Sequence, residues 1–324
     1  MKARQNISGS RKILSALGEV VLAVLTLLPL GNLSPNTIRL LFVTLVWVTV
    51  SVAWNLVGGF GGQISFGFAV FYGLGAYTAA LAINGGINPV LSFVLAALVA
   101  MVASLLVGLP TFRLRGPYFA IATIGVSEAV RVLMTNFSLT GGASGYRIME
   151  KGVFRQLDHY YAALILALLA VTVSIYIRRS GFGLALVAIR EDEDAASDLG
   201  VNPFRAKLLA HAIAAALTGT AGGVYARYAA FIHPQGVFAF NIGVAILLMP
   251  IIGGVGTIWG PVIGAVVYGF VNEELVASFP QLHLLLYGTL LVLIVLFEPE
   301  GVVGLFRKGY PLLARIRRAH AVHS

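Results

Sequence analysis

The chain has 324 residues, of which 58% are hydrophobic and only 11% are charged, and its net charge is +9. A typical soluble domain carries about 25% charged residues, and one core could not bury so much apolar surface. The composition therefore excludes a soluble globular fold and predicts a chain that spans a lipid bilayer. No soluble basic face is present for binding nucleic acid, and the absence of cysteine excludes disulfides and thiolate chemistry.

Two long stretches lack charge almost completely. Residues 40–112 contain no Asp, Glu, Lys, Arg or His, and residues 228–272 contain only His233. A spanning helix needs about 20 apolar residues, so these stretches have room for three spans and two spans. The whole chain is predicted to be an all-α, polytopic transmembrane helix bundle of about ten spans, some of them broken or re-entrant. The predicted spans are residues 13–30, 38–57, 64–83, 88–109, 117–138, 158–177, 207–231, 237–253, 258–277 and 282–297.

The first apolar run, at 13–30, follows four basic residues and resembles a signal peptide. The residues that follow it do not form a small-residue cleavage site, so we expect an uncleaved span. Glu19 lies inside the run and leaves an interfacial helix as the alternative.

The Lys and Arg residues predict the orientation of the bundle. With both termini in the cytoplasm, the cytoplasmic segments hold 16 of the 22 Lys and Arg, and the outer loops hold four. This asymmetry is what the positive-inside rule predicts. The expected organisation is a cytoplasmic tail at 1–12, a transmembrane domain at 13–306 and a basic cytoplasmic tail at 307–324. Two loops are long enough to carry function, an external one at about 139–157 and a cytoplasmic one at about 178–206.

A glycine-rich segment follows the second predicted span. Its pattern, Gly58-Gly59-Phe60-Gly61, recurs at Gly253-Gly254-Val255-Gly256. Transporters often contain internal duplications with broken helices, although short glycine patterns also recur by chance, and both interpretations stay open. Asn55, Gln63 and Ser65 flank the first segment, where they could bond unwound backbone or contact a transported molecule. Elsewhere, small-xxx-small spacings predict close helix packing at Gly219-xxx-Gly223 and Gly260-xxx-Gly264.

Glu128 and Arg131 stand within the span predicted at 117–138. Residues at i and i+3 share a helix face, so the two side chains can pair. Ionisable groups within a span usually face the bundle interior or a water-filled cavity. The pair therefore either lines or gates a path, or it fixes the bundle or reaches the outer interface. Asn136 and Thr140 follow toward the external loop, where Arg147, Lys151 and Arg155 are either solvated or meet acidic groups of a partner.

The cytoplasmic loop contains a compact polar insertion. Carboxylates at 191–194 favour a helix N-terminus, and Gly200 followed by Pro203 favours its end. We expect a short helix of about two turns outside the bilayer, with a small apolar patch formed by Ala195, Ala196 and Leu199. The segment is either a solvated acidic loop or a docking element for a cytoplasmic partner.

Five motifs in sequence order resemble the branched-chain amino-acid ABC importer permease family, and the resemblance covers about residues 40–306. The long external loop and the motif order resemble the "M" type of subunit in that family rather than the "H" type. The motifs are Asn55-Leu56-x-Gly58-Gly59-x-Gly61-Gly62-Gln63-Ile64-Ser65-Phe66-Gly67, Glu128-x-x-Arg131 with Asn136 and Leu139-Thr140-Gly141-Gly142-x-x-Gly145, Arg190-Glu191-Asp192-Glu193-x-Ala195-Ala196-x-x-x-Gly200, Gly253-Gly254-x-Gly256-x-x-x-Gly260-Pro261-x-x-Gly264-Ala265, and Pro299-x-Gly301.

The resemblance implies a permease in the bacterial inner membrane that moves branched-chain or related hydrophobic amino acids into the cytoplasm by alternating access. It implies four partner chains: a homologous second permease, two cytoplasmic ATPase subunits that use ATP, and a periplasmic substrate-binding protein. It also implies two sets of functional residues. Those expected to couple to the ATPases are Arg190, Glu191, Asp192, Asp194, Ala195, Ala196, Leu199 and Gly200. Those expected at the translocation path or its gate are Asn55, Gln63, Ser65, Glu128, Arg131, Asn136 and Thr140.

The chain itself is not expected to be an enzyme. It has no Gly-Lys dipeptide and hence no phosphate-binding P-loop, and no HExxH or paired-histidine motif indicates a metal. We expect no cofactor of its own. Two alternatives stay open, an ion-coupled secondary transporter of a small polar solute and an ABC permease for urea or amides.

Overall fold

The computed structural model describes residues 33–149 and 154–278, with a few isolated positions beyond residue 281. The predicted first span, both predicted tails and nearly all of the predicted tenth span lie outside the described residues.

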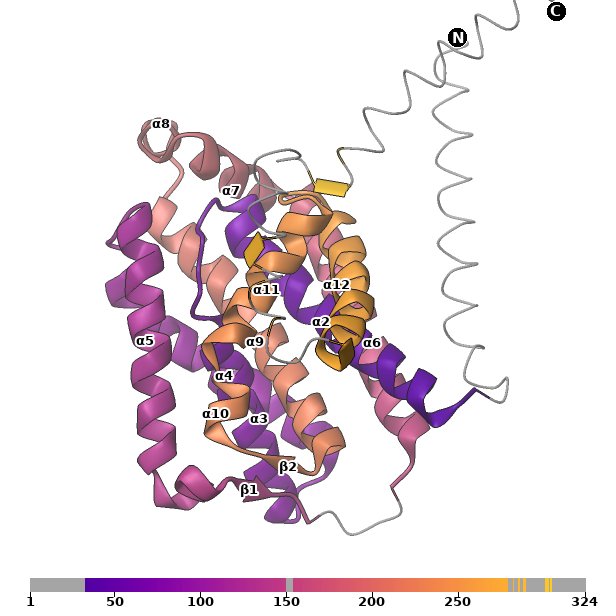
Figure 1. The fold of residues 1–324 in the computed structure, drawn as a ribbon. Helices are drawn as coiled ribbons and strands as arrows, with labels where there is room; N and C mark the ends of the chain where they lie inside the picture. Colours follow the sequence, from indigo (N-terminus) through magenta and orange to yellow (C-terminus); the bar gives the residue numbers. More distant parts are fainter. Residues whose placement is uncertain are drawn as a thin grey trace, which may run out of the picture.

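The described chain is almost entirely helical (Figure 1). Its only strands are β1 and β2, two residues each, which form an antiparallel pair with Tyr146 opposite Ile232 and Arg147 opposite Phe231. The helices are α2 (Pro35–Asn55), the π-helix η2 (Leu56–Phe60), α3 (Phe68–Asn84), α4 (Pro89–Thr111), α5 (Pro117–Asn136), the short 3-10 helices η3 (Ser138–Thr140) and η4 (Gly142–Ser144), α6 (Gln156–Arg179), α7 (Gly181–Glu191), α8 (Glu193–Asp198), α9 (Pro203–Ala229), α10 (Pro234–Val237), α11 (Phe240–Gly253) and α12 (Gly260–Ser278); the strands are β1 (Tyr146–Arg147) and β2 (Phe231–Ile232).

Helices occupy all eight predicted spans that fall within the described residues. Six of them are long and apolar enough to cross a membrane, and two further apolar helices, Phe68–Asn84 and Gly260–Asn272, are shorter. The all-α, polytopic class is therefore confirmed, while the total of ten spans and the cytoplasmic placement of the termini stay predictions. The bounds differ in detail from the prediction. Helix α3 begins at Phe68 rather than at residue 64, and the span predicted at 237–253 is divided into α10 and α11.

Polar caps and prolines set the starts of several long helices. Ser34 caps α2, Asn88 caps α4 and Asn202 caps α9, and in each case the side-chain oxygen accepts a hydrogen bond from a backbone N–H of the first turn. A proline follows each cap, where its missing N–H removes no helical hydrogen bond.

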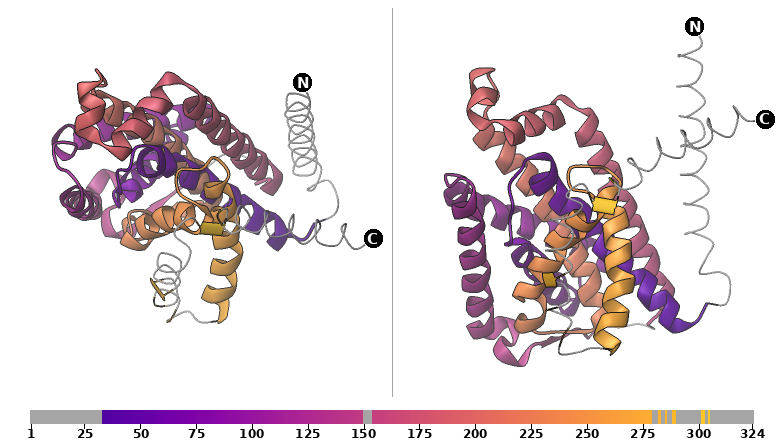
Figure 2. Two further views of the ribbon diagram at one scale, coloured as in Figure 1. Left: turned by 90° about the horizontal axis from the view of Figure 1, so that it is seen from above. Right: turned by 45° about the horizontal axis from the view of Figure 1, so that its top comes forward.

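The core of the bundle forms around α9, which packs between α3 and α4 along a stripe of small residues (Figures 1 and 2). A Cβ on Gly219 would lie 2.8 Å from the carbonyl oxygen of Ala96, and one on Gly223 would lie 3.0 Å from the Cβ of Ala79. The stripe therefore allows the helix backbones to approach closely, as the small-xxx-small spacing predicts. Gly264 packs in the same way against the backbone of α11 at Met249.

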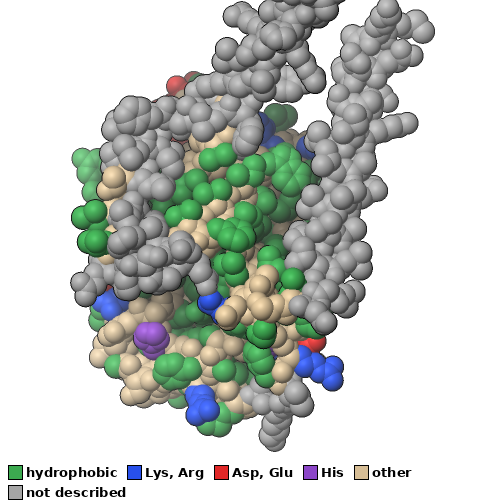
Figure 3. Space-filling view, turned by 45° about the vertical axis from the view of Figure 1, so that its right-hand side comes forward, with side chains coloured by type: hydrophobic (Ala, Val, Ile, Leu, Met, Phe, Trp, Pro, Cys, Tyr) green, Lys and Arg blue, Asp and Glu red, His purple; other side chains and the backbone are tan. Residues whose placement is uncertain are grey.

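The surface of the bundle carries many exposed aliphatic and aromatic side chains. Figure 3 shows hydrophobic side chains spread over one face, with Lys and Arg toward its margins. On α4 the exposed set includes Val94, Leu98, Val102 and Leu106. An apolar outer surface is expected where lipid surrounds the bundle.

The long helices run between two distinct ends. The α7–α8 segment, residues 181–200, lies at one end, and the β1–β2 ribbon lies at the other (Figure 1). Helix α5 stands at one side of the bundle, and few of its residues are buried.

Candidate functional site

Two glycine-rich helix breaks meet at the α7–α8 end of the bundle. The first lies at the end of α2, where the backbone forms the π-helix η2 and then runs without helix from Gly61 to Gly67. The second is the loop at 254–259 between α11 and α12. A Cβ on Gly59 would lie 2.7 Å from the backbone nitrogen of Gly256, so the two GGxG segments are in direct contact. Residues 55–62 and 254–259 are called the glycine junction below.

Asn55 joins the two sides of the glycine junction. Its side chain is fully buried. Its Nδ2 donates to the carbonyl of Thr257 at 2.9 Å, and its Oδ1 accepts from the backbone N–H of Gly256 at 2.9 Å. Of the two uses open to Asn55 on sequence, the structure shows the bonding of unwound backbone.

The extended segment at 61–67 is held by groups from distant parts of the chain. The indole Nε1 of Trp54 donates to the carbonyl of Ser65 at 2.8 Å, and the hydroxyl of Thr123 on α5 accepts from the backbone N–H of Phe66 at 3.1 Å. The hydroxyl of Ser65, which is buried, accepts from the N–H of Gly67. Gln63 is half-buried, and its backbone N–H donates to Val57 in η2. Irregular backbone within a membrane domain is tolerated where protein or a water-filled cavity surrounds it.

Arg190 connects the α7–α8 segment to the glycine junction. Its Nη1 donates to the carbonyl of Gly59 at 3.1 Å, and its aliphatic stem lies against Gly62, which has a φ of 69°. Nη1 also lies 2.7 Å from the position that a Cβ on Gly256 would occupy. Glu191 holds the guanidinium from the other side, since its Oε1 accepts from both Nε and Nη2 of Arg190.

The polar insertion forms two helices rather than one. Arg190 and Glu191 end α7, and Asp192 caps α8, with its Oδ1 accepting from the N–H groups of Asp194 and Ala195 at 2.9 Å each. Gly200 follows α8 with a φ of 87°, in the left-handed region that a glycine adopts without strain.

The predicted apolar patch on α8 is divided between two faces. Ala196 is buried and packs inward, whereas Ala195 is exposed and Leu199 is 85% exposed. The insertion therefore presents Leu199 outward and uses Ala196 to hold α8 against its own chain.

An ionic contact links α8 to the beginning of α5. Arg115 lies two residues before α5, and its two terminal nitrogens donate to the two carboxylate oxygens of Asp194 at 3.0 and 3.1 Å. The guanidinium lowers the pKa of the Asp194 carboxyl, first by hydrogen bonding and then by its charge. Beside this contact, the Nζ of the buried Lys207 on α9 lies 2.6 Å from the carboxylate of Glu193.

Sequence reasoning did not identify Arg115, Glu193 or Lys207 as site residues. The sequence does indicate that Lys207 has a partner, because an ammonium group near the start of an apolar helix needs an opposite charge. The contact of Arg115 with Asp194 joins residues 79 positions apart, and no local pattern encodes it.

Glu128 and Arg131 pair on α5, as their spacing predicts. The Nε of Arg131 donates to Oε2 of Glu128 at 2.9 Å, and Nη2 of Arg131 contacts Oε1. The Glu128 side chain is 53% exposed and the Arg131 side chain is 28% exposed. Glu128 lies roughly 16 Å along a helix of about 30 Å, at 1.5 Å per residue. A charged side chain near the centre of a bilayer costs about 2.5–3.5 kcal/mol, which disfavours placing this part of α5 against lipid.

The other two path candidates bond only within their own segment. The Nδ2 of Asn136 donates to the carbonyl of Val132, and the buried hydroxyl of Thr140 donates to the carbonyls of Phe137 and Met134. The seven path candidates therefore do not form one cluster. Asn55, Gln63 and Ser65 belong to the glycine junction and the segment after it, while Glu128, Arg131, Asn136 and Thr140 lie along α5 and the turn that follows it.

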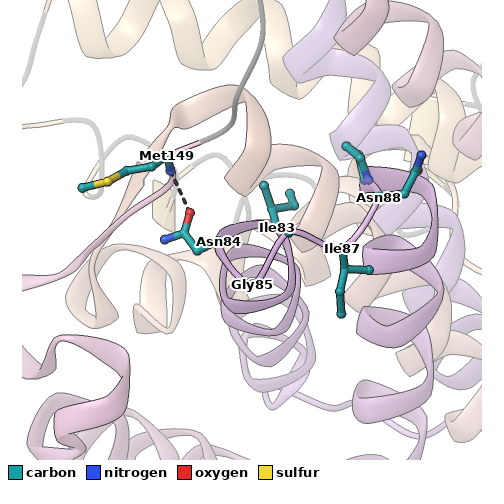
Figure 4. A pocket seen from close by; sticks show the side chains of 8 residues that line it. Ile83, Asn84, Gly85, Ile87, Asn88 and Met149 are labelled. Atoms are coloured by element: carbon teal, nitrogen blue, oxygen red, sulfur yellow. Dashed lines mark hydrogen bonds between the residues drawn. The ribbon is translucent and has the colours of Figure 1, made fainter.

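At the opposite end, Asn84 fixes the β1–β2 ribbon to the end of α3. Its Nδ2 donates to the carbonyl of Arg147 at 2.8 Å. Its Oδ1 accepts from the N–H of Met149 at 2.7 Å, the bond drawn in Figure 4. An open hollow of about 440 Å³ lies beside this contact, lined by residues 83–89 and Met149. Arg147 and Arg155 are exposed at this end, and Lys151 lies outside the described residues.

A predominantly helical bundle with membrane-length helices around broken, buried helix ends defines a multi-pass membrane protein, and such broken helices are frequent in transporters. The family described as "Branched-chain amino acid transport system / permease component" matches residues 36–295. The chain belongs to this family, and it is thus a membrane transport permease of the ABC importer class.

Curated relatives of the chain include two types of permease subunit. The chain is 31% identical, over 94% of its length and 81% of the relative, to the high-affinity branched-chain amino acid transport system permease protein LivM of Salmonella typhimurium, and it matches LivM of Escherichia coli to the same extent. It is 26% identical to LivH of Escherichia coli, over 80% of this chain and 91% of that protein. No solved structure matches the chain.

Proposed function

We propose that this chain is the LivM-type permease subunit of an ABC importer that moves branched-chain or related hydrophobic amino acids into the cytoplasm. It works in the bacterial inner membrane beside a homologous LivH-type permease. Two cytoplasmic ATPase subunits use ATP to switch the pore between outward and inward access, and a periplasmic binding protein delivers the substrate. The chain contributes no ATPase site and no cofactor.

The α7–α8 segment is the observation that carries this proposal. It lies at one end of the bundle and presents Leu199 outward. From its inner side, Arg190 reaches the glycine junction and Asp194 reaches the start of α5. An ATPase that moves this segment would therefore act on a helix break through Arg190, and on the long, weakly packed helix α5 through Asp194. We assign this end to the cytoplasm, in agreement with the positive-inside rule.

The outer face of α5 is the proposed wall of the translocation path. It consists of residues that share one side of the helix and lie away from the bundle: Tyr118, Ile121, Gly125, Glu128 and Val132. A carboxylate on this face favours contact with water or with a second protein over contact with lipid. The second permease then faces α5 across the pore.

The β1–β2 end is the proposed receptor surface for the binding protein. Arg147 and Arg155 are exposed there, and the Asn84 hydrogen bonds hold the ribbon in place. Exposed arginines suit carboxylates on the docking protein. Reversing the charge of Arg147 and Arg155 should lower the stimulation of ATPase activity by the binding protein, and unchanged stimulation would remove this assignment.

The experiment that tests the proposed function is reconstitution of the chain with a LivH-type permease, both ATPases and a binding protein in liposomes. We expect ATP-dependent uptake of leucine, isoleucine or valine. Uptake that needs an ion gradient and no ATPase would instead establish a secondary transporter. Uptake of urea or amides with ATP would keep the importer class and change the substrate.

The chain contains no cysteine, so single-cysteine variants can test the position of α5 directly. Val132→Cys, on the outer face of α5, should react with a membrane-impermeant, charged thiol reagent in the assembled complex. Leu98→Cys, at a similarly exposed position on α4, is the matched lipid-facing control and should react slowly. Equal reactivity at the two positions would contradict the proposed path.

A further inference from the structure

The Glu128–Arg131 pair presents opposite charges side by side near the middle of α5. The two side chains bond through two contacts, and 53% of the Glu128 side chain is nevertheless exposed. The pair therefore leaves carboxylate lone pairs open while it holds both charged groups in a fixed relative position. Among the described residues, the two side chains bond to each other, so no contact with another helix explains why the pair points away from the bundle.

The surroundings of the pair are apolar and contain free space. Gly125, one turn before Glu128, leaves open space on this face, since no atom from outside its own stretch of helix backbone lies within 4 Å of the position that a Cβ would occupy. Ile121 and Val132 flank this gap on the same face and are 66% and 47% exposed. The outer face of α5 thus combines two opposite charges, a gap and two aliphatic side chains.

We propose that Glu128 and Arg131 form a recognition subsite for the zwitterionic head group of an aliphatic amino acid in transit. This proposal rests on the proposed function above. The carboxylate of Glu128 accepts from the substrate ammonium, and the guanidinium of Arg131 donates to the substrate carboxylate. The aliphatic side chain of the substrate lies over Gly125 between Ile121 and Val132.

The charge balance of the pair suits a transport path. The empty subsite has no net charge, because the two side chains neutralise each other when no substrate is present. An amino-acid zwitterion also has no net charge, so the path stays neutral when the subsite is occupied. The substrate competes with an ion pair that already exists, which keeps binding weak, and a path needs sites that release the substrate as readily as they bind it.

A pair that served only to hold the bundle would be expected to join α5 to a neighbouring helix. Glu128 and Arg131 instead bond to each other within one helix, so these bonds do not join α5 to another helix. Neighbouring residues on the opposite side of α5, such as Ser127 and Thr123, are the buried ones.

The first test uses the unaltered permease complex in nanodiscs without the binding protein. Bound radiolabelled leucine is displaced by unlabelled leucine, by leucinamide, which lacks the carboxylate, or by 4-methylpentanoate, which lacks the ammonium. We expect leucine to displace the label at concentrations about tenfold lower than either analogue, the factor that corresponds to one lost contact of about 1.4 kcal/mol. Equal displacement by all three compounds, or no leucine binding at millimolar concentrations, would overturn the subsite.

The second test separates the two roles by substitution. Glu128→Gln should abolish the advantage of leucine over 4-methylpentanoate and keep its advantage over leucinamide. Arg131→Gln should have the opposite effect. A purely structural pair would lose or keep both advantages together in both variants, which would refute the proposed roles. Arg113→Gln, at an exposed arginine between α4 and α5, is the control and should keep both advantages.

Failure of this inference can be told apart from failure of the proposed function by an uptake assay. If the unaltered complex takes up no leucine with ATP, the proposed function itself is wrong. The unaltered complex could instead take up leucine with ATP, and the double variant with Glu128→Gln and Arg131→Gln could take up as much leucine per ATP. In that case only the proposed subsite is wrong. We expect this variant to lose about tenfold in uptake per ATP while the binding protein still stimulates its ATPase activity.

Discussion

Replacing Asn55 by leucine should loosen the glycine junction without creating a cavity, because leucine has the same branched arrangement of side-chain heavy atoms and is the larger of the two. Asn55 is fully buried, and it makes one hydrogen bond to the backbone of Gly256 and one to the backbone of Thr257. A net hydrogen bond contributes about 1 kcal/mol, and each group left unsatisfied costs about 1–3 kcal/mol. Gly256 and Thr257 are half-buried, so the cost of leaving each backbone group without its hydrogen bond should lie near the lower end of this range. The two lost bonds together predict a destabilisation of about 2–4 kcal/mol.

The assay is thermal unfolding of the purified complex in detergent. With about 2 °C per kcal/mol for a chain of this size, Asn55→Leu should lower the Tm by about 4–8 °C. Asn136→Leu is the matched control, since Asn136 is exposed and bonds only to the preceding turn of its own helix. The Tm of Asn55→Leu could instead lie within about 1 °C of the Tm of the control and of the unaltered complex. That result would refute the view that Asn55 holds the two helix breaks together.

Three further changes test other contacts. Gly219→Val should destabilise the bundle by about 3 kcal/mol or more through overpacking against α4, seen as loss of the monodisperse complex in gel filtration. Arg115→Ala should lower transport per ATP more than Arg113→Ala, a change at a nearby exposed arginine, and exchanging the charges of Arg115 and Asp194 should restore it. Arg115 lowers the pKa of the Asp194 carboxyl. The ionic contact should therefore be present above the ordinary aspartate pKa and be lost as the pH falls through the lowered pKa of Asp194. Cross-linking between α8 and the start of α5 that does not change with pH would contradict this prediction. Lys207→Met should lower the Tm, since it leaves its partner carboxylate on α8 without a buried cation.

The helices themselves could be predicted well from the sequence. Long apolar runs and Gly or Pro punctuation identify where the chain must span and where it must turn, because lipid offers no hydrogen-bond partner to irregular backbone. The caps at Ser34, Asn88 and Asn202 act within four residues and are encoded locally. The pairing of Glu128 with Arg131 follows from helical spacing for the same reason.

The helix breaks and the ionic contact at α8 could not be predicted in the same way. The glycine run at 58–62 predicts a break but not its length, since Thr123 and Trp54 bond the extended segment from other parts of the fold. The direction of Ala196 depends on which face of α8 packs inward, and six helical residues are too few for a clear pattern. The approach of Arg115 to Asp194 depends on the arrangement of α5 relative to α8.

The α7–α8 segment contacts different helices of the bundle through its two halves. Arg190 of α7 bonds to the glycine junction, whereas Asp194 and Glu193 of α8 bond to Arg115 and Lys207. A force applied to the segment acts most strongly on the contacts nearest to the point where it is applied. A push at Leu199 would therefore act mainly through Arg115 on α5, and a push at Leu184, which is 64% exposed, mainly through α7 on the glycine junction. The position at which an ATPase grips the segment would then decide which helix moves first.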